Sequence, residues 1–123
     1  MVFQAESRGR PPRLKLTQTT PVVLRFPSGD RVQGKLQVVS VTGGLLWLSS
    51  PLNEGSRGKL MFVIDAGAVL GTAEMLNPIS RTQQPFKFVE IGKSDRSRLQ
   101  QTIQASADQN WRDQQAIVRD RAW

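Results

Sequence analysis

The sequence predicts an all-β domain, a six-stranded antiparallel β-barrel, followed by a C-terminal α-helix. Between residues 21 and 91, short apolar runs alternate with turn residues, which is typical of consecutive strands. After Gly92 the apolar residues change to a helical period, and no Pro or Gly occurs from Ser94 to Arg121. A chain of 123 residues is suited to a single hydrophobic core.

Residues 1–20 are predicted to form a flexible basic arm. The Pro11-Pro12 pair favours an extended backbone and excludes a helix at this point. The segment contains few residues that a core would bury. Its cations are Arg8, Arg10, Arg13 and Lys15.

Six strands and their turns follow. The strands are predicted over residues 22–26, 31–41, 45–49, 59–64, 68–76 and 86–91. Turns are expected at Pro27-Ser28-Gly29-Asp30 and Asp65-Ala66-Gly67, where glycine supplies a positive φ. Strict alternation in residues 31–41 places one parity in the core and the other in water. The parity predicted to be buried comprises Val32, Gly34, Leu36 and Val38.

The C-terminal segment is predicted to be helical, with Ser94 as the N-cap. Leu99, Ile103 and Ala107 form a narrow apolar stripe, so the first half of the helix is expected to pack on the barrel. We therefore divide the chain into the arm, a barrel with the start of its closing helix over residues 21–104, and a helical extension over residues 105–123.

The composition favours a binding protein over an enzyme. Seventeen Lys and Arg residues against 10 Asp and Glu residues give a formal charge of +7. Because the chain has no Cys, His or Tyr, it offers no disulfide, no thiolate, no imidazole base and no Cys or His metal ligand. No pair of carboxylates has a spacing that suggests acid–base catalysis. We expect a non-enzymatic protein, without cofactor or metal, that binds an anionic partner.

The sequence also predicts a soluble, cytoplasmic protein. Residues 1–10 contain no apolar leader. No stretch approaches the roughly 18 consecutive apolar residues that a membrane-spanning helix requires.

Two clusters are candidates for ligand binding. Arg8, Arg10 and Arg13 carry planar donor forks that can clamp phosphates, although a solubilising tail would have the same composition. The second cluster is Ser40 with Gly43-Gly44, where a ligand can approach the backbone and a hydroxyl is at hand. A double glycine at a strand end is more often simply a bulge or a tight bend.

The order of these pieces resembles the PilZ domain family over residues 8–103. A basic arm and two strands precede Ser-x-x-Gly-Gly-Leu and Pro-Leu-x-x-Gly-Ser, and Phe-Val-Glu-Ile-Gly-Lys-Ser-Asp-Arg-Ser-Arg-Leu leads from the last strand into the helix. The resemblance implies binding of cyclic di-GMP, a bacterial second messenger, by an Arg-x-x-x-Arg arm and an Asp/Asn-x-Ser-x-x-Gly motif. Ser40, Gly43 and Arg13 match these motifs, whereas Val38 and Gly9 replace the acidic or amide residue and the first arginine.

Three functions remain open at this stage. The first is a cyclic di-GMP receptor whose arm becomes ordered over the barrel on binding and signals to a partner. The second is a PilZ-like adaptor that does not bind the nucleotide and contacts a motility, pilus or secretion component through the C-terminal helix, with Trp111 and Trp123. The third is a basic barrel that binds single-stranded nucleic acid, which the lack of an exposed aromatic platform disfavours. Trp47 is expected either to flank the ligand pocket or to lie in the core.

Overall fold

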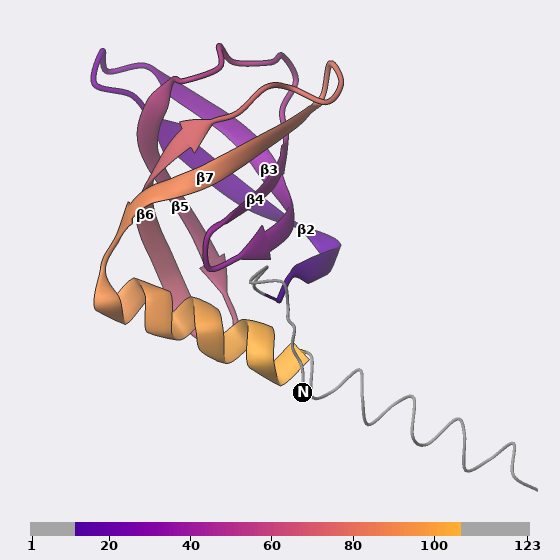
Figure 1. Ribbon diagram of the computed structural model, residues 1–123, viewed down its shortest axis with the longest axis vertical. Coiled ribbons are helices and arrows are strands. Elements are labelled where there is room, and N and C mark those ends of the chain that lie inside the picture. Colours follow the sequence, from indigo (N-terminus) through magenta and orange to yellow (C-terminus); the bar gives the residue numbers. More distant parts are fainter. Residues whose placement is uncertain (1–11, 107–123) are drawn as a thin grey trace, which may run out of the picture.

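A closed antiparallel β-barrel with one helix across its end is the architecture of this chain (Figure 1). The computed structural model describes residues 12–106, except for the side chains of residues 17–19. The strands are β2 Leu14–Arg25, β3 Arg31–Ser40, β4 Gly43–Trp47, β5 Arg57–Ile64, β6 Gly67–Met75 and β7 Gln83–Ile91. The predicted fold class is therefore confirmed.

The barrel closes because β2 pairs with a neighbour on both sides. The strand order is β2-β3-β4-β7-β6-β5, and every neighbouring pair is antiparallel. Alternating residues of each strand point inward and fill the interior with aliphatic and aromatic side chains. The largest of those that are fully buried include Leu24, Leu36, Leu46, Leu60, Phe62 and Met75.

The first strand begins well before the predicted position. β2 starts at Leu14, not at Val22, so residues 14–20, which were expected in the arm, belong to the barrel. The pairing register with β3 shifts between Lys15 and Thr20. β2 pairs with β5 only from Val22 onward, so Pro21, which has no N–H, lies beyond the segment paired on both sides.

A bulge in β3 reverses the predicted parity of its second half. The register with β4 shifts between Leu36 and Val38, so one extra residue lies on the β3 side. As a result Val39 is fully buried, whereas Val38 is only partly buried and lies on the outer side of the barrel. The prediction that Val38 belongs to the core was wrong, because alternation holds only while the register is unbroken.

The helix begins at residue 93 and is described as far as residue 106. The N–H of Arg96 donates to the carbonyl of Gly92 at 2.9 Å, so Gly92 and not Ser94 occupies the N-cap position. Leu99 and Ile103 are buried against the barrel core, as the stripe predicted. Ala107, Trp111 and Trp123 lie outside the described residues. No helix in residues 12–106 is long and apolar enough to cross a membrane.

Polar contacts fix this helix to the β5–β6 turn and to the first residues of β6. The carboxylate of Asp95 accepts the N–H of Leu70 at 3.0 Å, and Arg98 donates to the carbonyl of Ala68 at 2.7 Å. The N–H of Ala66 donates to the hydroxyl of Thr102 at 3.3 Å. These contacts satisfy backbone groups at the end of the barrel that the helix covers.

Candidate functional site

A pocket of about 460 Å³ lies on the outer side of the barrel, beside the turn between β3 and β4. This volume lies within the range of roughly 300–1,000 Å³ that is usual for small-molecule sites. The pocket collects residues from four separate parts of the chain. It is lined by Arg13, Val38, Ser40, Thr42, Gly43, Gly44, Leu45, Leu76, Ile79, Pro85, Phe86 and Lys87.

Four of the residues predicted from the sequence to form the site line this one pocket: Arg13, Ser40, Gly43 and Gly44. Arg13 stands just before β2, and the other three belong to the end of β3 and the start of β4. The pairing of Leu14 with Val39 brings the two segments together. The other two predicted residues, Arg8 and Arg10, lie outside the described residues.

The turn from Ser40 to Gly43 is held by the Ser40 side chain. Its Oγ donates to the carbonyl of Gly43 at 3.2 Å and accepts the N–H of Thr42 at 3.3 Å. The Thr42 hydroxyl lies 3.1 Å from the same oxygen. Ser40 is also buried, with 6% of its surface exposed. The Ser40 hydroxyl therefore shapes the turn in this conformation.

The double glycine allows three strands to approach one another closely. A Cβ added to Gly43 would clash with the carbonyl oxygen of Phe86 on β7, and one added to Gly44 would clash with the carbonyl oxygen of Val38 on β3. Backbone atoms cannot move aside as the end of a flexible side chain can. Both glycines are thus required by packing, which is the structural alternative that the sequence left open.

Of the described residues, two cations line the pocket, Arg13 and Lys87, and the sequence identified only Arg13 as a site residue. Lys87 on β7 pairs with Gly43 and lines the pocket together with Arg13. Lys15 on β2 stands directly opposite Val38, so its side chain leaves the barrel on the same side. No local sequence signal marks Lys87, because only the β4–β7 register brings it to the turn.

Glu74 on β6 neutralises part of this positive charge. Its carboxylate accepts a hydrogen bond from Arg57 at 2.9 Å and lies 3.6 Å from the Lys87 ammonium. The hydrogen bond from Arg57 and the charges of Lys87 and Arg57 hold the pKa of Glu74 below its ordinary value. Glu74 is thus an ion-pair partner of both cations.

The remaining wall of the pocket is apolar. Val38, Leu45, Leu76, Ile79 and Pro85 contribute aliphatic surface, and Ile79 is 66% exposed. Apolar surface next to cations suits a ligand that has both a flat apolar part and an anionic part. Among the described residues, no group of three or more Asp and Glu side chains is placed to hold a metal ion.

Trp47 was predicted either to flank the ligand pocket or to lie in the core, and it does neither. It does not line this pocket, and its side chain is 36% exposed instead of buried. The ammonium of Lys35 lies 5.5 Å from the centre of its ring, a cation–π contact on the outer surface. Within residues 12–106 it is the one exposed aromatic side chain, which is too few for a stacking platform for single-stranded nucleic acid.

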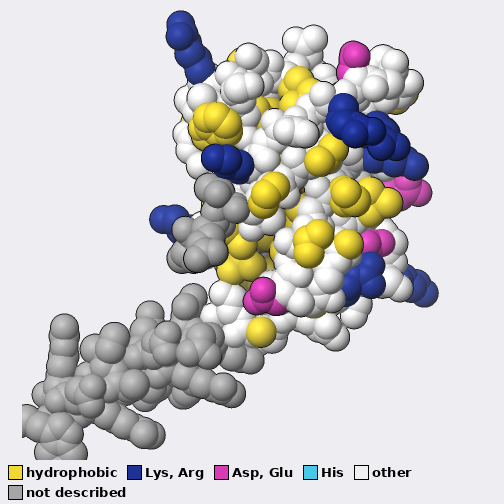
Figure 2. Space-filling view, turned by 180° about the vertical axis from the view of Figure 1, so that it is seen from behind, with side chains coloured by type: hydrophobic (Ala, Val, Ile, Leu, Met, Phe, Trp, Pro, Cys, Tyr) yellow, Lys and Arg dark blue, Asp and Glu magenta, His cyan; other side chains and the backbone are white. Residues whose placement is uncertain are grey.

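Positive charge also extends over the opposite side of the molecule. Figure 2 shows Lys and Arg side chains spread around exposed hydrophobic groups, with several acidic side chains between them. Met61 on β5 and its cross-strand partner Leu70 on β6 are among the exposed apolar residues, at 46% and 47%. The net charge of the chain is therefore distributed, and the pocket holds only part of it.

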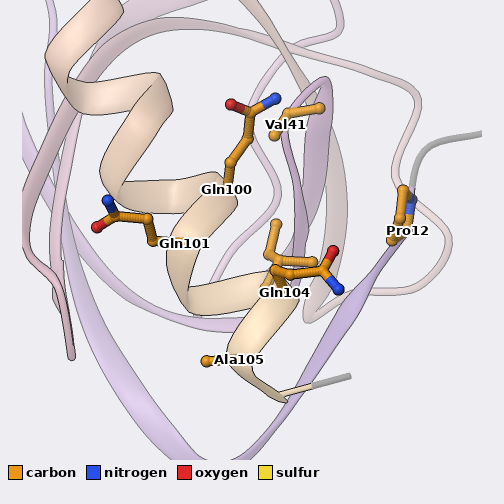
Figure 3. A pocket seen from close by; sticks show the side chains of 7 residues that line it. Pro12, Val41, Gln100, Gln101, Gln104 and Ala105 are labelled. Carbon is orange, nitrogen blue, oxygen red and sulfur yellow. The ribbon is translucent and has the colours of Figure 1, made fainter. Parts of the chain in front are cut away.

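A second pocket, of about 600 Å³, lies next to the first and borders the helix (Figure 3). Pro12 and Val41 form one side, and Gln100, Ile103 and Gln104 form the helical side. Residues that are adjacent in the chain line different pockets. Pro12 lines the second pocket, and the next residue, Arg13, lines the first. Likewise Val41 lines the second pocket, while both its neighbours in the chain line the first.

Comparison with known proteins identifies the fold through structure and not through sequence. No family model and no curated protein sequence matches the chain. The structure of the PilZ domain of YcgR from Escherichia coli with cyclic di-GMP superposes with a TM-score of 0.69 at 18% identity, over 89% of this chain and 98% of that chain. This chain has the PilZ fold.

Other PilZ-fold structures agree. MrkH from K. pneumonia matches with a TM-score of 0.72 at 18% identity, over 89% of this chain and 55% of MrkH. The Bacillus subtilis inhibitor of motility, MotI/DgrA, matches with a TM-score of 0.65 at 15% identity, over 83% of this chain and 53% of that protein. The chain thus spans about half the length of these two proteins and nearly all of the isolated YcgR domain.

Proposed function

We propose that this chain is a PilZ-type receptor module that binds cyclic di-GMP in the pocket beside the β3–β4 turn. One observation carries the proposal: Arg13 and the Ser40–Gly44 turn, which are distant in sequence, line a single pocket. The YcgR structures of the same fold contain cyclic di-GMP, which supports this choice of ligand. The proposal includes a binding role without catalysis and a location in the bacterial cytoplasm.

Each part of the pocket has a task in this proposal. The guanidinium of Arg13 pairs with a phosphodiester through two parallel hydrogen bonds, and Lys87 supplies a second positive charge. The apolar wall contacts the purine rings. Arg8 and Arg10, which precede Arg13 in the chain, add further phosphate contacts as the N-terminal arm becomes ordered over the ligand.

The neighbouring pocket offers a route for the signal. Arg13 contacts the ligand, and Pro12, which directly precedes it, lines the second pocket together with Gln100 and Gln104 of the helix. Figure 3 shows Pro12 and the helical glutamines around this pocket. In this proposal, a shift of Arg13 toward a phosphate moves Pro12 relative to that helical face. We propose that this face, or the extension beyond it, presents the bound state to a protein partner.

Titration calorimetry with cyclic di-GMP tests the receptor proposal. We expect saturable binding at ligand concentrations up to about 100 µM, and a loss of at least about tenfold in affinity in Arg13→Ala. Arg31→Ala removes the same charge from an exposed position outside the pocket and is the matched control. Absence of heat, or an affinity that Arg13→Ala leaves unchanged, would overturn the proposal.

The second candidate is an adaptor that works without the nucleotide. It is favoured by Val38, an apolar residue in the pocket at the position where the PilZ motif has Asp or Asn. MotI/DgrA, an inhibitor of motility with the same fold, supports a partner in motility machinery. A pull-down from a motile bacterium, with the full chain and with a chain ending at Ser106, tests it. Equal capture of all partners by both chains would contradict a role for the extension.

A further inference from the structure

Three cations form a row across the outer face of β3, β2 and β5, which we call the cationic row. Arg25 is the direct cross-strand partner of Arg31 on one side and of Lys59 on the other, and all three side chains are exposed. Cross-strand neighbours lie about 5 Å apart, and like charges directly opposite each other destabilise a sheet. Within residues 12–106, no ion pair involves any of the three. The repulsion in this row is therefore not relieved by a carboxylate from that part of the chain.

An apolar row lies beside the cationic row, two residues away on the same strands. It consists of Val23, Met61 and Leu70, which are direct cross-strand partners on β2, β5 and β6. Met61 and Leu70 are 46% and 47% exposed, and Val63, the next residue on this face of β5, is 64% exposed. Alternate residues of a strand share a face and lie about 7 Å apart. The two rows therefore form one amphipathic surface.

We propose that this surface binds an acidic amphipathic helix of a partner protein. The apolar side of the helix packs on the apolar row, and its carboxylates pair with the cationic row. A helix suits the spacing, because side chains three and four residues apart on a helix lie about 5–6 Å from each other, close to the distance between the cations. The cationic row spans about 10 Å, which is two turns of helix. Arg25 and Lys59 also line a hollow of about 460 Å³, in which a carboxylate side chain can sit.

The charge along this face favours a partner with patterned charge over an anionic membrane. Beyond Lys59, the line of cross-strand partners continues through Thr72 of β6 to Glu90 of β7, which is exposed. The sign of the charge thus reverses along one line. An anionic bilayer is negative everywhere and is repelled by Glu90, whereas a helix can carry its carboxylates at one end only. The apolar row is also aliphatic, without the Trp or Phe typical of helices that lie on membranes.

Other occupants match the charge of this surface less well. A second copy of the chain carries a net charge of +7 and presents the same cations. The C-terminal segment over residues 107–123 contains three Asp and three Arg residues, so it has no excess of negative charge. No residue of either row lines the candidate nucleotide pocket. The inference is therefore independent of the proposed function.

Fluorescence anisotropy with a synthetic helix tests the inference. The labelled probe is a stapled peptide of about five helical turns, with Leu along one face and Glu beside it. We expect the full chain to bind it with a Kd below about 100 µM at low salt, and more weakly at high salt. The double variant Arg25→Gln with Lys59→Gln should bind at least about tenfold more weakly. The double variant Met61→Gln with Leu70→Gln should bind at least about fivefold more weakly.

Two matched variants and one matched peptide are the controls. Arg81→Gln removes an exposed cation from another part of the surface, and Ile79→Gln removes an apolar side chain that is 66% exposed. Both should bind the probe as the wild type does. The same peptide with Lys in place of Glu should not bind. Thermal unfolding separates binding from folding, because loss of Arg25 and Lys59 relieves repulsion and should leave Tm unchanged or raise it.

Three results would overturn the inference. The first is equal affinity of the wild type and the Arg25 and Lys59 double variant for the probe. The second is absence of saturable binding up to about 100 µM probe at low salt. The third is tighter binding to phosphatidylglycerol vesicles or to a single-stranded oligonucleotide that the same double variant loses, which would assign the cationic row to a membrane or to nucleic acid.

Discussion

Glu74 on β6 and Lys87 on β7 are direct cross-strand partners, and their charged groups lie 3.6 Å apart at the edge of the candidate pocket. The carboxylate also binds Arg57, at 2.9 Å. Lys87 lines the pocket, so the same ammonium faces a carboxylate on one side and the ligand site on the other. The ion pair thus links the stability of the barrel to the charge available for an anionic ligand.

Removing the Glu74 charge is expected to strengthen binding of a phosphorylated ligand. Glu74→Gln keeps a side chain of the same shape but releases Lys87 from its counter-charge. We expect a gain of about two- to fivefold in affinity for cyclic di-GMP at low salt, which shrinks at high salt as charges are screened. Calorimetry at two ionic strengths measures it. An equal or weaker affinity at low salt would show that Lys87 takes no part in binding.

The same residue gives the barrel a defined dependence on pH. Because Arg57 lowers the pKa of Glu74 in the folded state, its contribution to stability is complete above the unfolded-state pKa near 4.5 and is lost as the pH falls through the lower folded-state pKa. Thermal unfolding from about pH 6 to about pH 3 should therefore show a smaller loss of Tm in Glu74→Gln than in the wild type. Parallel Tm curves for the two proteins would contradict this.

Leu99 is expected to anchor the closing helix. Its side chain is fully buried against the barrel core, so Leu99→Ala leaves a cavity and should lower the free energy of unfolding by about 2–5 kcal/mol. Gln101→Ala, on an exposed position of the same helix, is the control and should change it by less than about 0.5 kcal/mol. Urea denaturation of the three chains measures both effects. Similar midpoints for Leu99→Ala and the control would mean that the helix is not part of the cooperative core.

Asp95 is expected to hold the helix to β6 through its charge and its geometry. Its Oδ1 accepts the N–H of Leu70 at 3.0 Å and pairs with Arg98 at 2.9 Å. Asp95→Ala loses both contacts and should destabilise the fold by about 1–2 kcal/mol. Asp95→Asn keeps an acceptor for the N–H of Leu70, so its loss of stability should be about half that of Asp95→Ala. The order of the Tm values tests this, and an Asn variant as unstable as the Ala variant would assign the whole effect to the ion pair.

Gly44 is expected to be required for folding, independently of any role in ligand binding. A Cβ at this position would meet the carbonyl oxygen of Val38, and the Phe86 ring would lie only 3.1 Å away. Gly44→Ala should therefore destabilise the chain by at least about 1–3 kcal/mol through displaced strands. Circular dichroism during thermal unfolding measures the loss. A stable variant that had lost only ligand binding would instead favour direct backbone contact with the ligand.

The sequence alone determined the local elements of this protein. Alternation and turn residues predicted six strands, five of them close to their observed positions, because a half-buried strand must show a period of two. The stripe of Leu99 and Ile103 predicted how the helix packs. Arg13, Ser40, Gly43 and Gly44 were identified from motif order, and they do line one pocket.

Tertiary structure decided what depends on strand register. The β3 bulge turned Val38, which was predicted to lie in the core, to the outer side of the barrel. The pairing of Gly43 with Lys87 brought a cation to the pocket from a strand that is distant in sequence. The early start of β2 and the choice of Gly92 as N-cap follow likewise from pairing with β3 and docking on β6. Register is set by long-range backbone pairing, and the local pattern from which the strands were predicted does not encode it.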